Sequence, residues 1–364
     1  MKRRILVVAV LPVFFVWGPL MGQSPSVEEQ LRRNGAVSLP RVALIDVFLG
    51  RWERAPKVRE EGLQVNINDA KAFGRDGIKS LQSAANLRQV CVGEDFPEEW
   101  CADLSKLTQL EGLYFTLTPF TASPEKSGLG DVGKMHQLRA LSLLNAKVGD
   151  EHIRRLSSLK GLRFLCLAGN EISDEGLKSL TSMLDLEEID LDRTKVCGDG
   201  FVHLRGTPKL RRIRITNEIG GLTEAGLKHL AKMPDLREIV GRGNIQSEAH
   251  IKLLAFAPKL QTLDLGDAAV SDESIKFLLD YPNLKHLDLT ATGVSGKALK
   301  TLSAAKNLEE LNLALTAVDD PSLEFVQDMP RLRTINLAST KVTKTGTDKL
   351  RKHRPDLEIL GSFE

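Results

Sequence analysis

The sequence predicts an α/β solenoid, a horseshoe with a parallel β-sheet on its concave face and helices on its convex face. The first observation is a fixed period. A leucine-led hexad close to L-x-x-[LIV]-x-[LIV] opens twelve times between residues 87 and 357, and seven of the eleven spacings are 24 residues. The second is that each copy joins a strand-like half to a helix-like half. The third is that aromatic residues make up only 5% of the chain while leucine fills the same slot repeatedly. Such units stack, and each supplies its neighbour's core.

The strand half is clearest in LRFLCLAGNEISDEGLKSL, residues 162–180. Side chains alternate along a strand, so hexad positions 1, 4 and 6 (Leu162, Leu165 and Leu167) are expected to point into the core. Positions 3 and 5, here Phe164 and Cys166, then face out onto the concave surface. Twelve strands about 4.8 Å apart predict a sheet of about 50 Å along the stack.

The helix half follows a short turn. Ser173 stands where a helix N-cap is wanted, and the acidic Asp174 and Glu175 after it suit a helix N-terminus. Leu177 and Leu180, three residues apart, lie on one helix face and are expected to pack inward. A proline ends many of the later helices before the next strand, at Pro234, Pro258, Pro282 and Pro330.

These copies resemble the leucine-rich repeat family over roughly residues 60–360. Later copies carry the resemblance cleanly, as in LKHLDLTATGVSGKALKTL from Leu284 and LEELNLALTAVDDPSLEFV from Leu308. The resemblance implies the horseshoe fold and recognition of a protein through the concave sheet. It also implies that one turn column hydrogen-bonds the backbone of the adjacent turn. That column holds Asn170, Thr194, Thr292, Thr316 and Thr340.

The chain opens with a basic and then apolar stretch, MKRRILVVAVLPVFFVWGPLMGQ. Residues 1–23 are therefore predicted to be a signal peptide of a protein exported to the periplasm or the cell exterior. A membrane anchor formed by the uncleaved segment is the alternative. No Asn-x-Ser/Thr sequon occurs, which fits a bacterial exported protein. Residues 24–61 are predicted to form an N-terminal cap, with a strand over residues 42–49, and residues 62–361 the solenoid.

Two irregularities interrupt the period. The 28-residue spacing after Leu110 contains residues 116–134, TLTPFTASPEKSGLGDVGK, predicted to be an insertion loop suited to recognition. Its GLGDVG matches G-x-G-x-x-G in form but lacks the strand before it and the helix after it, so a flexible loop is predicted rather than a dinucleotide site. In the repeat from Leu236, Gly241 occupies inward position 6 and predicts a local bend or weak packing.

The remaining reactive residues give no catalytic constellation, and neither a cofactor nor a metal is predicted. His203 and His229 share a helix column, but no third metal ligand aligns with them. Four cysteines occupy positions that do not face one another, so free thiols are favoured over disulfides. They are Cys91, Cys101, Cys166 and Cys197.

The candidate binding residues are those at positions 3 and 5 of the strands. Along the stack an apolar stretch is followed by an acidic, a basic, and a long acidic and amide stretch. Asp264 and Asp288 are expected about 5 Å apart on adjacent strands, which disfavours both charges unless a cation binds. The alternative interpretation of the charged stretch is that Glu188 and Arg212 simply pair across strands. The candidates are Tyr114, Phe164, Asp190, Arg212, Arg214, Asp264, His286, Asp288, Asn312 and Asn336.

The sequence thus predicts a non-catalytic protein that binds a protein partner through its concave sheet, helped by residues 116–134. Without the three basic residues of the leader, 47 basic residues face 48 acidic ones, so the basic footprint of a nucleic-acid-binding protein is absent. No small-molecule substrate is evident. Two alternatives stay open: an envelope scaffold without a specific ligand, and an enzyme whose site lies in the loop or the cap.

Overall fold

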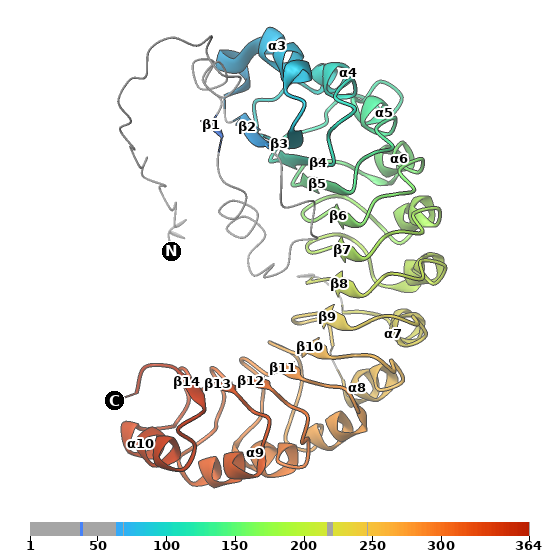
Figure 1. The fold of residues 1–364 in the computed structure, drawn as a ribbon. Helices are drawn as coiled ribbons and strands as arrows, with labels where there is room; N and C mark the ends of the chain where they lie inside the picture. The colour runs from blue at the N-terminus through green and yellow to red at the C-terminus, as the bar shows by residue number, and fades with distance from the viewer. Residues whose placement is uncertain (1–36, 39–62, 68, 217–220, 246, 364) are drawn as a thin grey trace, which may run out of the picture.

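The computed structural model describes residues 37–38, 63–67, 69–216, 221–245 and 247–363. The predicted leader (1–23) and almost all of the predicted N-terminal cap (24–61), with its strand at 42–49, lie outside the described residues. The described chain forms one open, curved sheet with helices along its outer side (Figure 1). This is the predicted α/β solenoid.

In the described residues, fourteen strands pair in the order in which they occur along the chain. The first is antiparallel to the second, and the later thirteen are parallel to one another. The strands are β1 (Val37–Ser38), β2 (Leu63–Ile67), β3 (Leu87–Val92), β4 (Gly112–Thr116), β5 (Ala140–Leu144), β6 (Phe164–Cys166), β7 (Glu188–Asp190), β8 (Arg212–Arg214), β9 (Glu238–Val240), β10 (Thr262–Asp264), β11 (His286–Asp288), β12 (Glu310–Asn312), β13 (Thr334–Asn336) and β14 (Glu358–Leu360).

Short helices follow the strands and cover the convex side (Figure 1). The α-helices are α3 (Ala70–Ser80), α4 (Cys101–Leu104), α5 (Leu129–Val132), α6 (Asp150–Arg154), α7 (Glu224–Ala231), α8 (Glu248–Leu254), α9 (Gly296–Leu302) and α10 (Lys344–His353). The 3₁₀-helices are η1 (Leu81–Ser83), η2 (Glu98–Trp100), η3 (Gly176–Leu180), η4 (Asp199–Leu204), η5 (Ile275–Asp280) and η6 (Pro321–Asp328). None of the helices in the described ranges is long and apolar enough to cross a membrane.

The core is one continuous apolar cluster that runs the length of the stack, from Val65 to Leu357. The predicted inward positions fill it: Leu162, Leu165 and Leu167 are all fully buried. Each helix half contributes two more side chains from one face, as at η3, where Leu177 and Leu180 are buried.

The strand register corrects the hexad pattern at both ends. β2 is a repeat that lacks the leucine-led spacing, because Leu63 pairs with Leu87 and a register shift directly after it places Gln64 opposite Gln89. At the other end Ile335 pairs with Ile359, so the last hexad opens at residue 356, not at Leu357 as predicted. The spacing there is the regular 24 residues.

The turn column satisfies backbone groups as the family resemblance implies, but in two ways. Asn170 reaches the preceding repeat, where Nδ2 donates to the Leu143 carbonyl (2.6 Å) and Oδ1 accepts from the N–H groups of Ala146 (3.0 Å) and Val148 (3.1 Å). Thr292, Thr316 and Thr340 instead donate to a carbonyl of their own turn, as Thr292 does to Leu289 (2.6 Å), and Thr340 also accepts from the Val342 N–H (3.3 Å). Asparagine therefore joins two turns, and threonine closes one.

Aspartates join consecutive repeats on the convex side. Asp272 Oδ1 accepts from the backbone N–H of Ser295 (2.8 Å), and its Oδ2 accepts from the Ser295 hydroxyl (2.6 Å). The same pair of bonds links Asp150 with Ser173 and Asp320 with Thr343. We call these three pairs the aspartate clasps.

The clasps change the roles predicted for the helix starts. Ser173 accepts from the Glu175 N–H (3.2 Å), but its hydroxyl donates to Asp150 of the preceding repeat. Asp174 is predicted to stabilise the N-terminus of its own helix with its charge. It instead accepts from the N–H groups of Cys197 (3.1 Å) and Gly198 (3.0 Å) in the next repeat. Polar side chains at these starts therefore hold the stack together as well as capping helices.

Residues 116–134 lie packed against the solenoid. Phe120 is buried with its ring 5.0 Å from that of Phe115, in an edge-on arrangement. Glu98 holds the segment through backbone groups: Oε1 accepts from the N–H of Ala122 (2.7 Å), and Oε2 from that of Gly128 (3.3 Å). The flexible loop predicted for GLGDVG is wrong, because its residues form α5 with Leu129 buried.

The irregular repeat from Leu236 keeps its place in the sheet, since β9 pairs in register with β8 and β10. A Cβ added at Gly241 would meet nothing closer than Ile239 Cγ2 at 3.6 Å. The inward slot can therefore take a methyl group in ordinary contact, and the local bend or weak packing stays a prediction. Gln246 of this repeat, which stands where other repeats have valine, lies outside the described residues.

Candidate functional site

The concave face has two parts that differ in exposure. From β2 to β7 the side chains at positions 3 and 5 are buried almost throughout: Phe164 is 2% exposed, Asp190 5% and Tyr114 7%. From β8 to β13 they are half-buried or exposed, and we call this part the open face. The prediction that Tyr114, Phe164 and Asp190 lie on an exposed surface is therefore wrong.

The physical reason for part of this burial is a second apolar cluster on the concave side. It is separate from the main core and comprises Tyr114, Ala140, Phe164, Cys166 and Ala168. Small residues surround the two rings, and a Cβ at Gly112 would lie 3.0 Å from Tyr114 Cε2. Aromatic side chains in this stretch therefore bury one another's surface.

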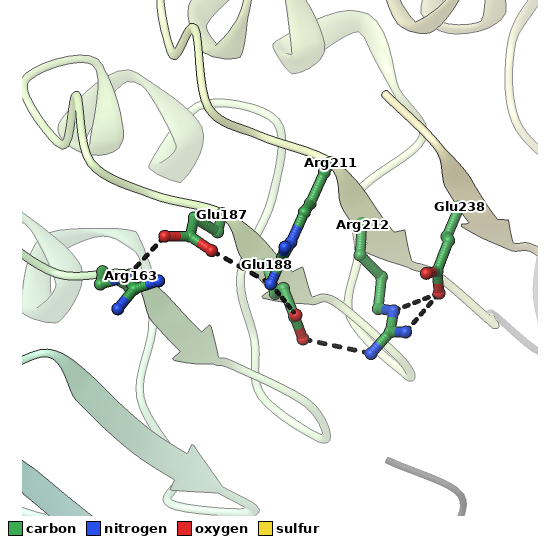
Figure 2. Close-up of polar contacts among 6 residues, drawn as sticks. All are labelled: Arg163, Glu187, Glu188, Arg211, Arg212 and Glu238. Atoms are coloured by element: carbon green, nitrogen blue, oxygen red, sulfur yellow. Dashed lines mark hydrogen bonds and ion pairs between the residues drawn. The ribbon is translucent and has the colours of Figure 1, made fainter. Parts of the chain in front are cut away.

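A continuous row of ion pairs crosses the sheet from the start of β6 to β9 (Figure 2). Glu188 is 2% exposed and lies between two guanidinium groups, Arg211 Nη2 (3.2 Å) and Arg212 Nη1 (3.3 Å). Arg212 also binds Glu238 of β9 through Nε (2.5 Å). The row continues on the other side through Glu187 to Arg163.

This row supports the alternative interpretation of the charged stretch, in which Glu188 and Arg212 pair across strands. Burial raises the pKa of Glu188, and the two arginines counter that rise. Sequence analysis missed the members at position 2, namely Arg163, Glu187 and Arg211. Their alternating charge at one hexad position in three successive repeats is the signal that could have found them.

Arg214 contacts a second pair of acidic residues, Asp190 and Asp192, at the end of β7. Its guanidinium binds Asp192 and lies 4.0 Å from Asp190 Oδ2. Burial, and then the neighbouring Asp192 charge, raise the pKa of Asp190 to about 7. Both arginines nominated as partner-binding residues thus bind carboxylates of this chain.

The acidic and amide residues at position 5 have a structural role that the sequence analysis did not assign. Each accepts a hydrogen bond from the backbone N–H two residues on, closing the turn that ends the strand. The donors and distances are Asp192 to Asp190 (2.9 Å), Gly266 to Asp264 (2.8 Å), Thr290 to Asp288 (2.8 Å), Ala314 to Asn312 (3.1 Å) and Ala338 to Asn336 (3.0 Å). One oxygen of each is thereby committed to the fold.

The predicted neighbours Asp264 and Asp288 do come together, because β10 and β11 pair with these two residues in register. Burial, and then the charge of Asp288, raise the pKa of Asp264. Next to them His286 Nδ1 lies 3.1 Å from Glu310 Oε2, at the exposed side of β11 and β12. The open face is thus rich in carboxylates towards the C-terminal strands.

The cysteines and histidines do not form a chemical site. All four cysteines are free, and burial raises the pKa of the Cys91 thiol to about 12 and raises those of Cys101 and Cys166 as well. Such thiols stay protonated and are poor nucleophiles. In the part of the chain that the structure describes, no group of three or more His, Cys, Asp or Glu residues is placed to hold a metal ion.

Comparison with known proteins supports the fold. A "Leucine Rich repeat" family model matches residues 162–180. An internalin from Listeria monocytogenes aligns with a TM-score of 0.56 and 17% identity over 84% of this chain and 87% of its own. TLR13, solved in complex with ssRNA13, aligns with a TM-score of 0.52 and 17% identity over 81% of this chain and 42% of its own. No curated protein sequence matches significantly. By its period, its stacked parallel strands and these matches, the chain has the leucine-rich repeat fold.

Proposed function

We propose that this protein binds a protein partner through the open face, strands β8 to β13 of the concave sheet. The observation that carries the proposal is the change in exposure along the sheet. The position 3 and 5 side chains are buried up to β7 and become accessible from β8 onward. Solenoids present extended concave surfaces of this kind to their ligands. The accessible strands also differ from one another in charge, as a specific surface requires.

From β10 to β13 the residues at position 3 suit contact with a partner because they lie outside the ion-pair row of Arg212 and Glu238. Thr262 and Thr334 are half-buried on β10 and β13, and Glu310 between them is exposed. Among the side chains at position 5, Asp264 and Asn336 alternate with these and use only one oxygen for the turn hydrogen bond, whereas Asp288 and Asn312 also bond to each other. A polar, partly hydrated contact surface of this type is normal for a partner that also exists unbound.

A nucleic acid fits this face less well than a protein. TLR13 is a protein of this fold solved with RNA. Here, however, the arginines of the open face are bound to carboxylates, as in Arg212 with Glu238 and Arg242 with Asp267 (2.5 Å). Phosphate backbones need a surplus of positive charge, which the acidic C-terminal strands do not provide.

The test is affinity capture from the native host with the tagged full chain. The blocking variant is Thr262→Arg with Thr334→Arg, which adds bulk and charge to the open face. The matched control is Thr301→Arg with Thr345→Arg, which makes the same change on the helices α9 and α10. A partner retained by wild type and the control and lost by the blocking variant supports the proposal. Equal recovery by all three, or no specific partner, favours the scaffold alternative.

We also propose that the chain acts outside the cytoplasm. The support is the sequence of residues 1–23, with its basic start and apolar middle. Cell fractionation, with mass spectrometry of the N-terminal peptide, tests this. Export with loss of about the first 23 residues is the expected result. An intact N-terminus in the membrane fraction would favour the anchor, and an intact chain in the cytoplasm would contradict export.

A further inference from the structure

The carboxylates on the concave face are not equally neutralised by this chain. On β7 to β9 each acidic side chain has an arginine: Glu188 and Glu238 share Arg212, and Arg214 lies between Asp190 and Asp192. On β10 and β11, Asp264 and Asp288 stand in register, and no cation of the described residues lies within 4.0 Å of either. The pairing of acidic side chains with arginine on β7 to β9 therefore does not continue at Asp264 and Asp288.

The hydrogen bonds of these two aspartates leave acceptor capacity. Asp264 Oδ1 accepts from the Gly266 N–H (2.8 Å), and Asp288 Oδ1 from the Thr290 N–H (2.8 Å). Asp288 Oδ2 also accepts from Asn312 Nδ2 (2.8 Å). The nearby guanidinium of Arg242 binds Asp267, with Nε 2.5 Å from Oδ2, and its charge acts on Asp264 and Asp288 only from beyond ion-pair distance. Two carboxylates on strands about 4.8 Å apart repel each other when nothing cationic lies between them.

A buried hydroxyl without a partner adjoins this pair. Thr290 is only 7% exposed, and its Oγ1 makes no hydrogen bond. It lies in the turn that Asp288 closes, and at the equivalent position of the preceding repeat a Cβ on Gly266 would lie 3.1 Å from Asp264 Oδ1, so this position adjoins the carboxylate. The equivalent residues of the adjacent repeats are Gly266 and Ala314, whose side chains offer neither a donor nor an acceptor. A buried polar atom left in this way points to a group that comes from outside the chain.

We propose that Asp264, Asp288 and Thr290 form a subsite for a lysine or arginine side chain of the protein partner. This inference rests on the proposed function of the open face and adds the chemistry of what that face recognises. An ammonium or guanidinium group would supply the donors for both carboxylates and for the hydroxyl oxygen. It would also supply the positive charge that Arg212 and Arg214 supply to the earlier strands. A calcium ion needs six to eight oxygen ligands, which this group does not provide.

The chain itself offers the clean substitution. Asn312 and Asn336 show that asparagine closes the same turn at position 5, so Asp264→Asn with Asp288→Asn removes the charge and keeps the turn hydrogen bonds. Thr290→Val removes only the hydroxyl. The charge-matched control is Asp280→Asn with Asp328→Asn, two exposed residues on the convex helices η5 and η6.

The first measurement is fluorescence anisotropy of labelled hexa-lysine and hexa-arginine peptides with the full chain at low salt. The Asp264→Asn, Asp288→Asn variant is expected to weaken binding about tenfold or more, and Thr290→Val a few-fold. The convex control should bind as wild type does. Equal affinity of wild type and the double variant would overturn the subsite. So would binding of calcium alone that abolishes peptide binding, because the site would then belong to a metal.

The captured partner separates this inference from the proposed function. A partner lost by Thr262→Arg with Thr334→Arg but kept by the double asparagine variant would leave the open face in place and reject the cationic subsite. Loss with both, at unchanged folding by circular dichroism, supports both. Retention by every variant rejects the open face itself.

Discussion

The buried carboxylate of Asp190 couples the stability of the fold to pH. Its folded-state pKa of about 7 lies above the ordinary value of 3.8, so the folded chain holds a proton there over a range in which the unfolded chain does not. Stability linked to this residue is therefore full at low pH and falls as pH rises from about 4 to about 7. Asp192 is the neighbouring charge that adds to the effect of burial.

We expect Asp190→Asn to remove this pH dependence. Asparagine keeps the hydrogen bond from the Asp192 N–H and carries no charge to bury. The variant should gain about 3 kcal/mol on wild type between pH 5 and pH 8, because wild type loses about 1.4 kcal/mol for each pH unit up to about pH 7. Urea midpoints of both proteins at the two pH values check this. A difference that is the same at pH 5 and pH 8 would contradict it.

Asn170 illustrates what one residue of the turn column contributes. Changing it to threonine, the residue that other repeats use there, keeps a bond within the turn and loses three bonds to the preceding repeat. Leaving buried backbone groups unpaired costs about 1–3 kcal/mol each, so Asn170→Thr should destabilise the fold by about 3 kcal/mol. The reverse change, Thr316→Asn, serves as the control in urea unfolding and should cost much less.

Sequence reasoning worked best where one side chain repeats one role. It predicted the inward leucines and the turn column, since both follow from strand alternation and from the family resemblance. It was wrong about the exposure of Phe164 and Tyr114, because alternation says which side of a strand a residue faces but not what packs there. The turn role of Asp264 and Asp288 also escaped it, since an acid two residues before a turn resembles a surface charge.

At the scale of elements, each aspartate clasp hydrogen-bonds the start of one helix to the start of the helix in the next repeat. Asp272 and Ser295 are 23 residues apart, so each clasp spans a whole repeat and lies outside the apolar core. A clasp therefore fixes the spacing of two convex helices, which the burial of leucines alone leaves adjustable. Only glycine fits beside one clasp, since a Cβ at Gly346 would lie 2.1 Å from Asp320 Oδ1.

Asp272→Ala is expected to destabilise the fold by about 2 kcal/mol, because it removes two hydrogen bonds to a charged acceptor that is half-buried. Asp280→Ala, an exposed neighbour on η5, should change stability by less than about 0.5 kcal/mol. Chemical unfolding followed by circular dichroism measures both. Equal effects of the two substitutions would show that Asp272 acts only through its charge.

At the scale of the whole molecule, Gly241 is a place where the continuous core can take one more methyl group. Gly241→Ala should stabilise the protein by about 0.4–1 kcal/mol, because the methyl group meets only ordinary contacts and the unfolded chain loses freedom. Gly346→Ala is the contrasting variant and should destabilise it through the clash with Asp320. Thermal unfolding of both checks the sign. A loss of stability in Gly241→Ala would mean that the slot is already closed.

The architecture could be predicted because one period repeats from end to end. Repeats of this kind can bury their apolar faces only by stacking on one another. The limits of that reasoning lie at β2 and β14, where the opening leucine is displaced by one residue. The division of the concave face into a buried and an open part did not follow either. It depends on which side chains of different repeats meet, and the pattern within one repeat carries no such information.

The clasps also bear on how such a chain changes length by recombination. Asp272 and Asp320, and likewise Ser295 and Thr343, are 48 residues apart, which is two repeats. Excision of residues 284–331 would bring Asp272 opposite Thr343 and restore an acceptor–donor pair. Excision of residues 284–307 alone would bring it opposite Asp319, and two acids would meet. In this part of the molecule the clasps therefore recur with the pair of repeats, although the leucine pattern counts the repeats singly.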